Sequence, residues 1–278
     1  MKASFKVFLA SVALASFSSC SKDPSYAQDS LGNKSSQLTE QSQSELKPEA
    51  IVIKASGDIT AALDEFRDLL GSKVNSSPGA VGGHREVNWD GGPANLTNNF
   101  LFPGDFFAAV DPLLPNGRKR GLVNTTPDGT GFSISDSNFK FINLKYNEQF
   151  KAFSPFKTFI AVGSTITDNT FKVPGFNDDA TVQGFGVVFS DVSNGSSTSL
   201  DFYDGDRLLG SFKVPNNGNN NPGGFSFLGV YFPNERVSRV RIHCGSAPLS
   251  STANDLSDGG GEDLVVMDDF LYSEPVKK

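Results

Sequence analysis

Two adjacent carboxylates, Asp268 and Asp269, interrupt the apolar run 264–272 near the end of the chain. Successive side chains of a strand point to opposite faces, so one carboxylate should face the core unless a bulge intervenes. A buried carboxylate needs a cation or several hydrogen-bond donors. We expect either a structural Ca²⁺, which takes about six to eight oxygen ligands, or capping of backbone amides, or pairing with an arginine such as Arg85.

The segment Asn88-Trp89-Asp90 is a candidate for ligand recognition. An indole offers a flat apolar face on which a sugar ring can stack, and the neighbouring amide and carboxylate can hydrogen-bond to sugar hydroxyls. A lone tryptophan in a sandwich can equally fill the core. The sequence therefore predicts one of two roles for Trp89, sugar platform or core filler.

Three polar side chains are predicted to face outward from one strand, Arg239, Arg241 and His243. They alternate with apolar residues of the stretch 237–244, which should face inward. Such a row could line a concave face for a polar or acidic glycan, although an ordinary solvated strand face has the same composition. Cys244 belongs to the inward set and is predicted to be a small buried hydrophobe.

Recognisable catalytic patterns are absent from the sequence. There is no G-x-S-x-G, H-E-x-x-H or G-x-x-x-x-G-K motif, and the two histidines cannot build a multi-histidine zinc centre. Carboxylate pairs exist, so a glycosidase remains an alternative. The acidic stretch 254–263 does not follow EF-hand spacing, and we predict a solvated loop there.

The N-terminus has the pattern of an export signal. Lys2 and Lys6 precede an apolar run over residues 7–17, and small residues precede Cys20. A cysteine directly after a signal-peptidase cut is the acceptor for bacterial lipidation. We predict a lipoprotein signal peptide over residues 1–19, with an ordinary secretory signal as the alternative. The apolar run is shorter than the ~20 residues that a spanning helix needs.

The rest of the chain divides into two predicted parts. Residues 20–49 are polar and should form a flexible tether, and residues 50–278 should form a single domain. The net charge of −7 argues against a nucleic-acid partner. The expected location is the cell envelope of a bacterium, at the outer membrane or cell surface, with an acyl anchor at Cys20 in the lipid bilayer.

Patterning predicts an all-β domain with one short N-terminal helix. Ile59, Leu63, Phe66 and Leu70 recur at helical spacing, and Gly71 follows as a stop. The chain has 25 Phe and 28 Gly, and later segments alternate between polar and apolar residues, with Gly/Asn-rich turns between them. Many short strands of this kind predict a jelly-roll-like two-sheet β-sandwich.

Four stretches carry a resemblance to a known family, at residues 84–91, 120–132, 184–192 and 266–272. They resemble a family of exported bacterial β-sandwich proteins, some of which carry PEP-type C-terminal sorting signals, and the resemblance extends over residues 50–274. It implies the fold and export and no particular activity. This chain differs in having Cys20 in place of a sorting tail, and His84 where the family more often has Arg.

These observations together predict a non-catalytic envelope lipoprotein whose jelly-roll domain binds a glycan or another surface polymer. The first alternative is a structural or protein-interaction module of the envelope. The second is a carbohydrate-active enzyme.

Overall fold

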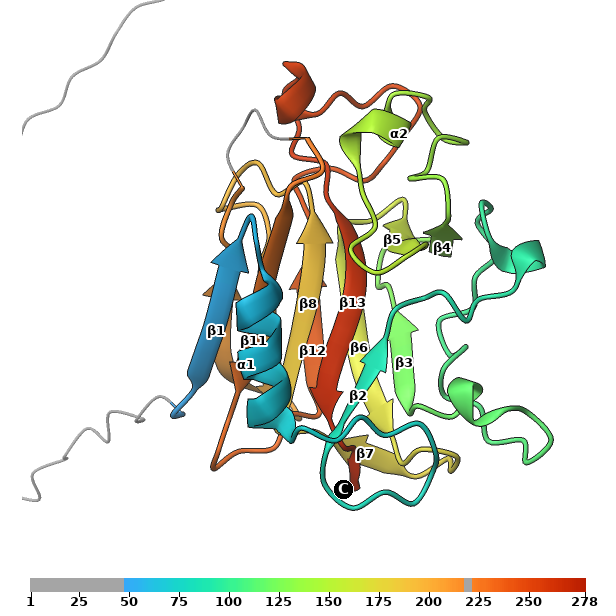
Figure 1. Ribbon diagram of the computed structural model, residues 1–278, viewed down its shortest axis with the longest axis vertical. Coiled ribbons are helices and arrows are strands. Elements are labelled where there is room, and N and C mark those ends of the chain that lie inside the picture. The colour runs from blue at the N-terminus through green and yellow to red at the C-terminus, as the bar shows by residue number, and fades with distance from the viewer. Residues whose placement is uncertain (1–47, 218–221) are drawn as a thin grey trace, which may run out of the picture. The chain divides into compact units, whose positions relative to one another are not determined.

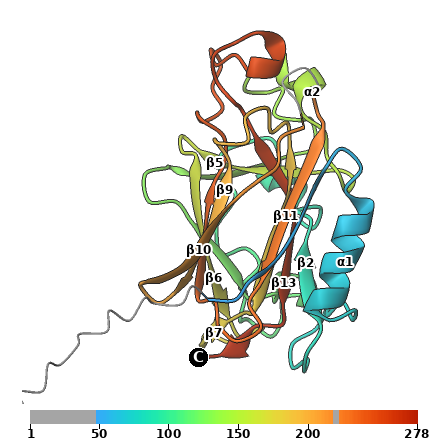
Figure 2. The ribbon, with the colours of Figure 1, turned by 90° about the vertical axis from the view of Figure 1, so that its left-hand side faces the viewer.

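The computed structural model describes residues 48–217 and 222–278, which belong to one compact unit, Glu45–Lys278. Two seven-stranded antiparallel sheets lie face to face in this unit (Figures 1 and 2). The predicted all-β two-sheet sandwich with one substantial helix is therefore confirmed.

We call the first sheet the covered sheet. In spatial order it contains β1 (Ile51–Ser56), β11 (Phe225–Tyr231), β8 (Gly184–Ser190), β13 (Val266–Ser273), β5 (Thr158–Val162) and β4 (Gly131–Ser135), with β2 (His84–Val87) also paired to β13.

We call the second sheet the open sheet. In spatial order it contains β10 (Arg207–Lys213), β9 (Ser199–Asp204), β12 (Arg239–His243), β6 (Ile166–Lys172), β7 (Asp179–Thr181) and β14 (Val276–Lys277), with β3 (Leu122–Thr125) also paired to β6.

The two α-helices of the described residues pack on the outer side of the covered sheet. They are α1 (Thr60–Leu70) and the single turn α2 (Tyr146–Gln149). Figure 2 shows α1 against this sheet and away from the open one. The described residues also form three short 3-10 turns, at Ala94–Leu96, Asn116–Arg118 and Leu256–Asp258. The described residues include no helix with the length and apolar character needed to cross a bilayer.

Helix α1 forms where its apolar spacing predicts, and it ends at Gly71, whose φ is +106°. Leu63, Phe66 and Leu70 are buried against the sheet. Gly186 and Gly229 make room for this contact, because a Cβ on either would lie 2.7 Å from the Phe66 ring. The two strand glycines thus allow the Phe66 ring to pack directly against the sheet backbone.

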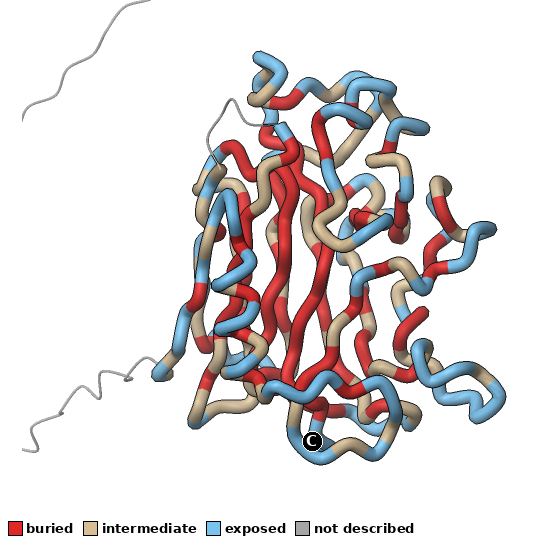
Figure 3. Tube along the Cα trace, viewed as in Figure 1, coloured by how far each residue is buried: buried red, intermediate tan, exposed pale blue. Residues whose placement is uncertain are grey.

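The central strands explain the large share of Phe in the sequence. β8 and β13 are buried over their whole length (Figure 3), because their inner faces contact the open sheet and their outer faces lie under α1 and the 139–150 segment. Val188 of β8 packs with α1, whereas Val182, between β7 and β8, belongs to the inner core.

Candidate functional site

Strand β12 lies inside the open sheet and presents the predicted polar row on its outer face. Arg239, Arg241 and His243 are partly exposed, whereas Val240 and Ile242 between them are buried in the core. The strand is paired with β9 on one side and β6 on the other. The prediction of which side chains of β12 face outward is confirmed.

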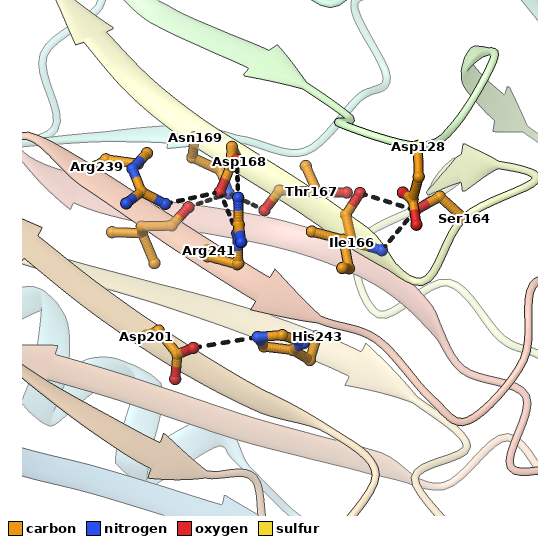
Figure 4. A network of polar contacts seen from close by, with 11 residues as sticks. Asp128, Ser164, Ile166, Thr167, Asp168, Asn169, Asp201, Arg239, Arg241 and His243 are labelled. Carbon is orange, nitrogen blue, oxygen red and sulfur yellow. Dashed lines mark hydrogen bonds and ion pairs between the residues drawn. The ribbon is translucent and has the colours of Figure 1, made fainter. Parts of the chain in front are cut away.

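Asp168 of β6 holds the two arginines together (Figure 4). It lies opposite Arg241 in the register and accepts from Arg241 Nε at 2.8 Å and from Nη2 at 2.7 Å. Arg239 Nη1 donates to the same carboxylate at 3.2 Å. Burial acts to raise the pKa of Asp168, but the hydrogen bonds and charges of the two arginines outweigh burial and lower it. Asp168 therefore stays ionised, and the two guanidinium groups are held rigidly.

Strand β9 contributes an aromatic ring and a second carboxylate. The Arg239 guanidinium lies 3.8 Å above the centre of the Tyr203 ring, a cation–π geometry. Asp201 Oδ2 lies 3.1 Å from Nε2 of His243, as Figure 4 shows. We call these six residues the strand-face array, namely Asp168, Asp201, Tyr203, Arg239, Arg241 and His243.

The strand-face array combines donors and acceptors on one surface. The side chains of Arg239, Arg241 and His243 are 25%, 31% and 36% exposed. A guanidinium has five N–H donors, and the contacts with Asp168 use one from Arg239 and two from Arg241. The remaining donors lie beside carboxylate acceptors, a combination that suits a ligand with many hydroxyl groups.

Trp89 is core filler, and its alternative role as a sugar platform is wrong for this structure. The side chain is fully buried and stacks on Phe159 with ring centres 3.7 Å apart. Its Nε1 donates to the Asp268 carbonyl at 2.8 Å. No face of the indole is available to a sugar unless the core opens.

The Asp90 side chain is already engaged in hydrogen bonds within the domain. Its Oδ1 accepts from the backbone amides of Phe156 at 2.6 Å and Lys157 at 3.0 Å, so it fastens the start of β5 to the segment that follows β2. Asn88 is exposed, so its side chain is accessible to a ligand. With Trp89 inside the core, however, the three residues do not form the predicted recognition surface.

A bulge in β13 places Asp268 and Asp269 on the same, outer face of the covered sheet. Met267 pairs with Phe189 and Phe270 with Val187, so the two aspartates together oppose one residue of β8. The bulge also marks the point where β13 changes its other partner from β5 to β2. Because of this bulge neither carboxylate enters the core between the sheets, although strict alternation along the strand would direct one of them there.

The partners of this carboxylate pair are hydrogen-bond donors. Phe153 N–H donates to Asp268 at 2.5 Å and the Ser154 hydroxyl to Asp269 at 2.7 Å, while Arg85 pairs with Glu274. Burial raises the pKa of both aspartates, and the neighbouring Asp269 charge raises that of Asp268 further. In the absence of a cation, the two neighbouring carboxylates favour sharing one proton, because both cannot easily be ionised side by side. Among the described residues no three His, Cys, Asp or Glu side chains converge as a metal site, and calcium at this pair stays a prediction.

Sequence reasoning missed a second acidic cluster, formed by Asp191, Asp255 and Asp263. The stretch 254–263 was predicted to be a solvated loop, but Asp255 and Asp263 are each only 1% exposed. Burial, and then repulsion from Asp255, raise the pKa of Asp191 to about 7. Spacing gives no signal for this cluster, because Asp191 comes from the end of β8 and the other two from a distant loop.

Asp168 and Asp201 were also missed. Each is a single polar residue in a strand, and only the register with β12 places it beside the arginines. Cys244 is buried as predicted, and burial raises the pKa of its thiol. Cys20, the signal peptide over residues 1–19 and nearly all of the tether lie outside the described residues.

Comparison with known proteins gives no relative: no family model, curated protein or solved structure matches the chain.

Proposed function

We propose that this protein is an exported envelope lipoprotein, anchored through an acylated Cys20, whose β-sandwich binds a glycan through the strand-face array. The proposal keeps the non-catalytic role expected from the sequence. It moves the recognition surface from Trp89 to the outer face of the open sheet.

One observation carries the proposal, namely the mixed polar array on a sheet face that the two helices leave free. Guanidinium donors and carboxylate acceptors alternate across β9, β12 and β6 and hold one another in place. A rigid array loses little conformational freedom when a ligand binds, which favours affinity. Because the arginines are already paired with Asp168, the array favours hydroxyl-rich chains over simple polyanions.

A glycan array followed by calorimetric titration tests this proposal. Arg239→Gln should weaken binding of the best ligand about tenfold, which is about 1.4 kcal/mol, because the guanidinium donors are lost. Arg207→Gln is the matched control, since Arg207 is ion-paired with Glu235 at the exposed start of β10, outside the array. Its affinity should equal that of the wild type.

Two results would count against the proposal. One is the absence of binding to any neutral or acidic polysaccharide. The other is equal affinity of Arg239→Gln and wild type for the ligand found, with both proteins giving the same melting temperature.

A further inference from the structure

The outward side chains of the open sheet are arranged in rows that run across its strands. Residues that face each other in an antiparallel pair point to the same side of the sheet, so the register shows which outward residues of successive strands stand in line. One row passes through the strand-face array and continues beyond it on both sides. We call it the polar row, and from β10 to β3 it contains Ser211, Asp201, Arg241, Asp168 and Thr125.

The polar row offers a hydrogen-bonding group on each of its five strands. Its two ends, Ser211 of β10 and Thr125 of β3, are exposed, and neither hydroxyl is hydrogen-bonded to another residue that the structure describes. Between them, carboxylate acceptors alternate with the Arg241 guanidinium. A ligand that crosses the sheet along this row therefore meets donors and acceptors at every strand.

The two neighbouring rows are interrupted by apolar side chains. The row that contains Tyr203 and Arg239 begins at Leu208, which is 50% exposed, and ends at Val123. The row on the other side places Ile166 opposite His243. Neither neighbouring row presents a polar group on every strand, so the sheet favours one line for a chain of hydroxyl groups.

Polar side chains of both neighbouring rows lean toward the polar row. Arg239 donates to Asp168 at 3.2 Å, and Nε2 of His243 lies 3.1 Å from Oδ2 of Asp201, as Figure 4 shows. Arg241 lies between the two carboxylates and is hydrogen-bonded to Asp168 at 2.8 Å. The contacts of the strand-face array thus converge on the polar row.

The spacing of the strands sets the length of ligand that the row can bind. Neighbouring strands lie about 4.8 Å apart, which is close to the length of one pyranose unit in an extended chain. Five strands therefore give a row about 19 Å long, which matches roughly four sugar units.

We propose that the polar row binds an extended, unbranched, neutral glycan that lies across the strands, with one sugar unit for each step between strands. This inference rests on the proposed function and specifies its ligand. The two arginines of the strand-face array are balanced by its two aspartates, and charge complementarity then favours a neutral chain. A β-1,4 linkage between pyranoses gives a straight chain that can follow the row, whereas an α-1,4 linkage gives a curved one.

Calorimetric titration of the full chain with oligosaccharides of two to six units tests the length and the direction. The probes are β-1,4-linked chains of glucose, mannose, xylose and N-acetylglucosamine, with α-1,4-linked glucose chains as the matched curved series. In the best β-1,4 series, the affinity should rise about threefold with each unit up to about four, because each unit adds hydrogen bonds, and then stay constant. The α-1,4 chain of four units should bind about tenfold more weakly than its β-1,4 counterpart.

Two variants shorten the row at its ends. Ser211→Ala and Thr125→Val each remove an exposed hydroxyl and should weaken binding of the four-unit chain about threefold. The two-unit chain, which binds at the charged centre of the row, should keep its affinity. Ser199→Ala is the matched control, because Ser199 faces the same way from β9 in a neighbouring row, and it should bind every length like the wild type.

The outcomes separate this inference from the proposed function. The absence of binding to any glycan, or equal affinity of Arg239→Gln and wild type, would overturn both. Binding that Arg239→Gln weakens can still overturn the inference alone. It does so if the affinity stops rising at two units, if only acidic glycans bind, if the α-1,4 chains bind equally well, or if Ser211→Ala and Thr125→Val both bind the four-unit chain like the wild type.

Discussion

The outer faces of the two sheets differ in what covers them. Every residue of β13 in the covered sheet is buried, whereas β12 in the open sheet alternates between buried and half-exposed residues. α1 and the 139–150 segment account for the difference, because both pack on the same side. On the outer side of the covered sheet, a second apolar core forms beneath α1 and the 139–150 segment. The outer face of the open sheet carries polar side chains that are hydrogen-bonded to one another.

We expect stability and the proposed ligand binding to depend on different residues. Residues between the covered sheet and α1 should matter for folding and little for a ligand. Residues of the strand-face array should matter less for folding, since salt bridges near solvent contribute little. Three substitutions test that division.

The largest effect is expected for Phe66→Ala, which removes a fully buried ring from the interface of α1 with the covered sheet. Loss of a large core side chain costs about 3–5 kcal/mol of unfolding free energy. Tyr203→Ala is the matched control on the open sheet and should cost about 1 kcal/mol. Chemical denaturation measures both, and equal losses would contradict the comparison.

A smaller effect is expected for Glu86→Gln, in the polar contact that ties α1 to β2. Burial acts to raise the pKa of Glu86, but hydrogen bonds from His84 and Arg67 outweigh it and lower the pKa to about 2. A folded-state pKa below the ordinary 4.5 means that the ionised carboxylate stabilises the fold above about pH 4.5, and that this contribution is lost as the pH falls toward 2. After allowance for solvent screening it amounts to about 1–2 kcal/mol.

Denaturation at several pH values checks this expectation. Glu86→Gln should be less stable than the wild type at pH 7, and the difference should narrow as the pH falls from 4.5 toward 2. Glu65→Gln, on the exposed side of α1, should follow the wild type throughout. A constant difference between Glu86→Gln and wild type would exclude the proposed linkage.

The smallest effect is expected for Asp168→Asn in the strand-face array. The change leaves Arg239 and Arg241 adjacent without their shared carboxylate, at a cost of about 1 kcal/mol near the surface. Because solvent ions screen such repulsion, the loss should shrink in high salt. Asp206→Asn in the exposed β9–β10 turn is the control. A loss as large as that of Phe66→Ala would show that the open face is also essential for folding.

Sequence reasoning predicted the elements whose signal is local. The spacing of Leu63, Phe66 and Leu70 predicted α1, and alternation along β12 predicted which of its side chains face outward. Asp168 and Asp201 could not be predicted as partners of the arginines, because strand order and register depend on contacts between distant segments. The burial of Trp89 depends likewise on Phe159 and on the bulge carbonyl of Asp268, neither of which lies near it in the sequence.

Because Trp89 is fully buried, its fluorescence can report on unfolding of the sandwich. The protein has a single indole, stacked on Phe159 inside the sandwich, so the intrinsic emission comes from one environment. That emission should be blue in the native state and move to the red only when water enters between the sheets. Ligands on the outer face of the open sheet should leave it unchanged, so fluorescence can follow unfolding independently of binding.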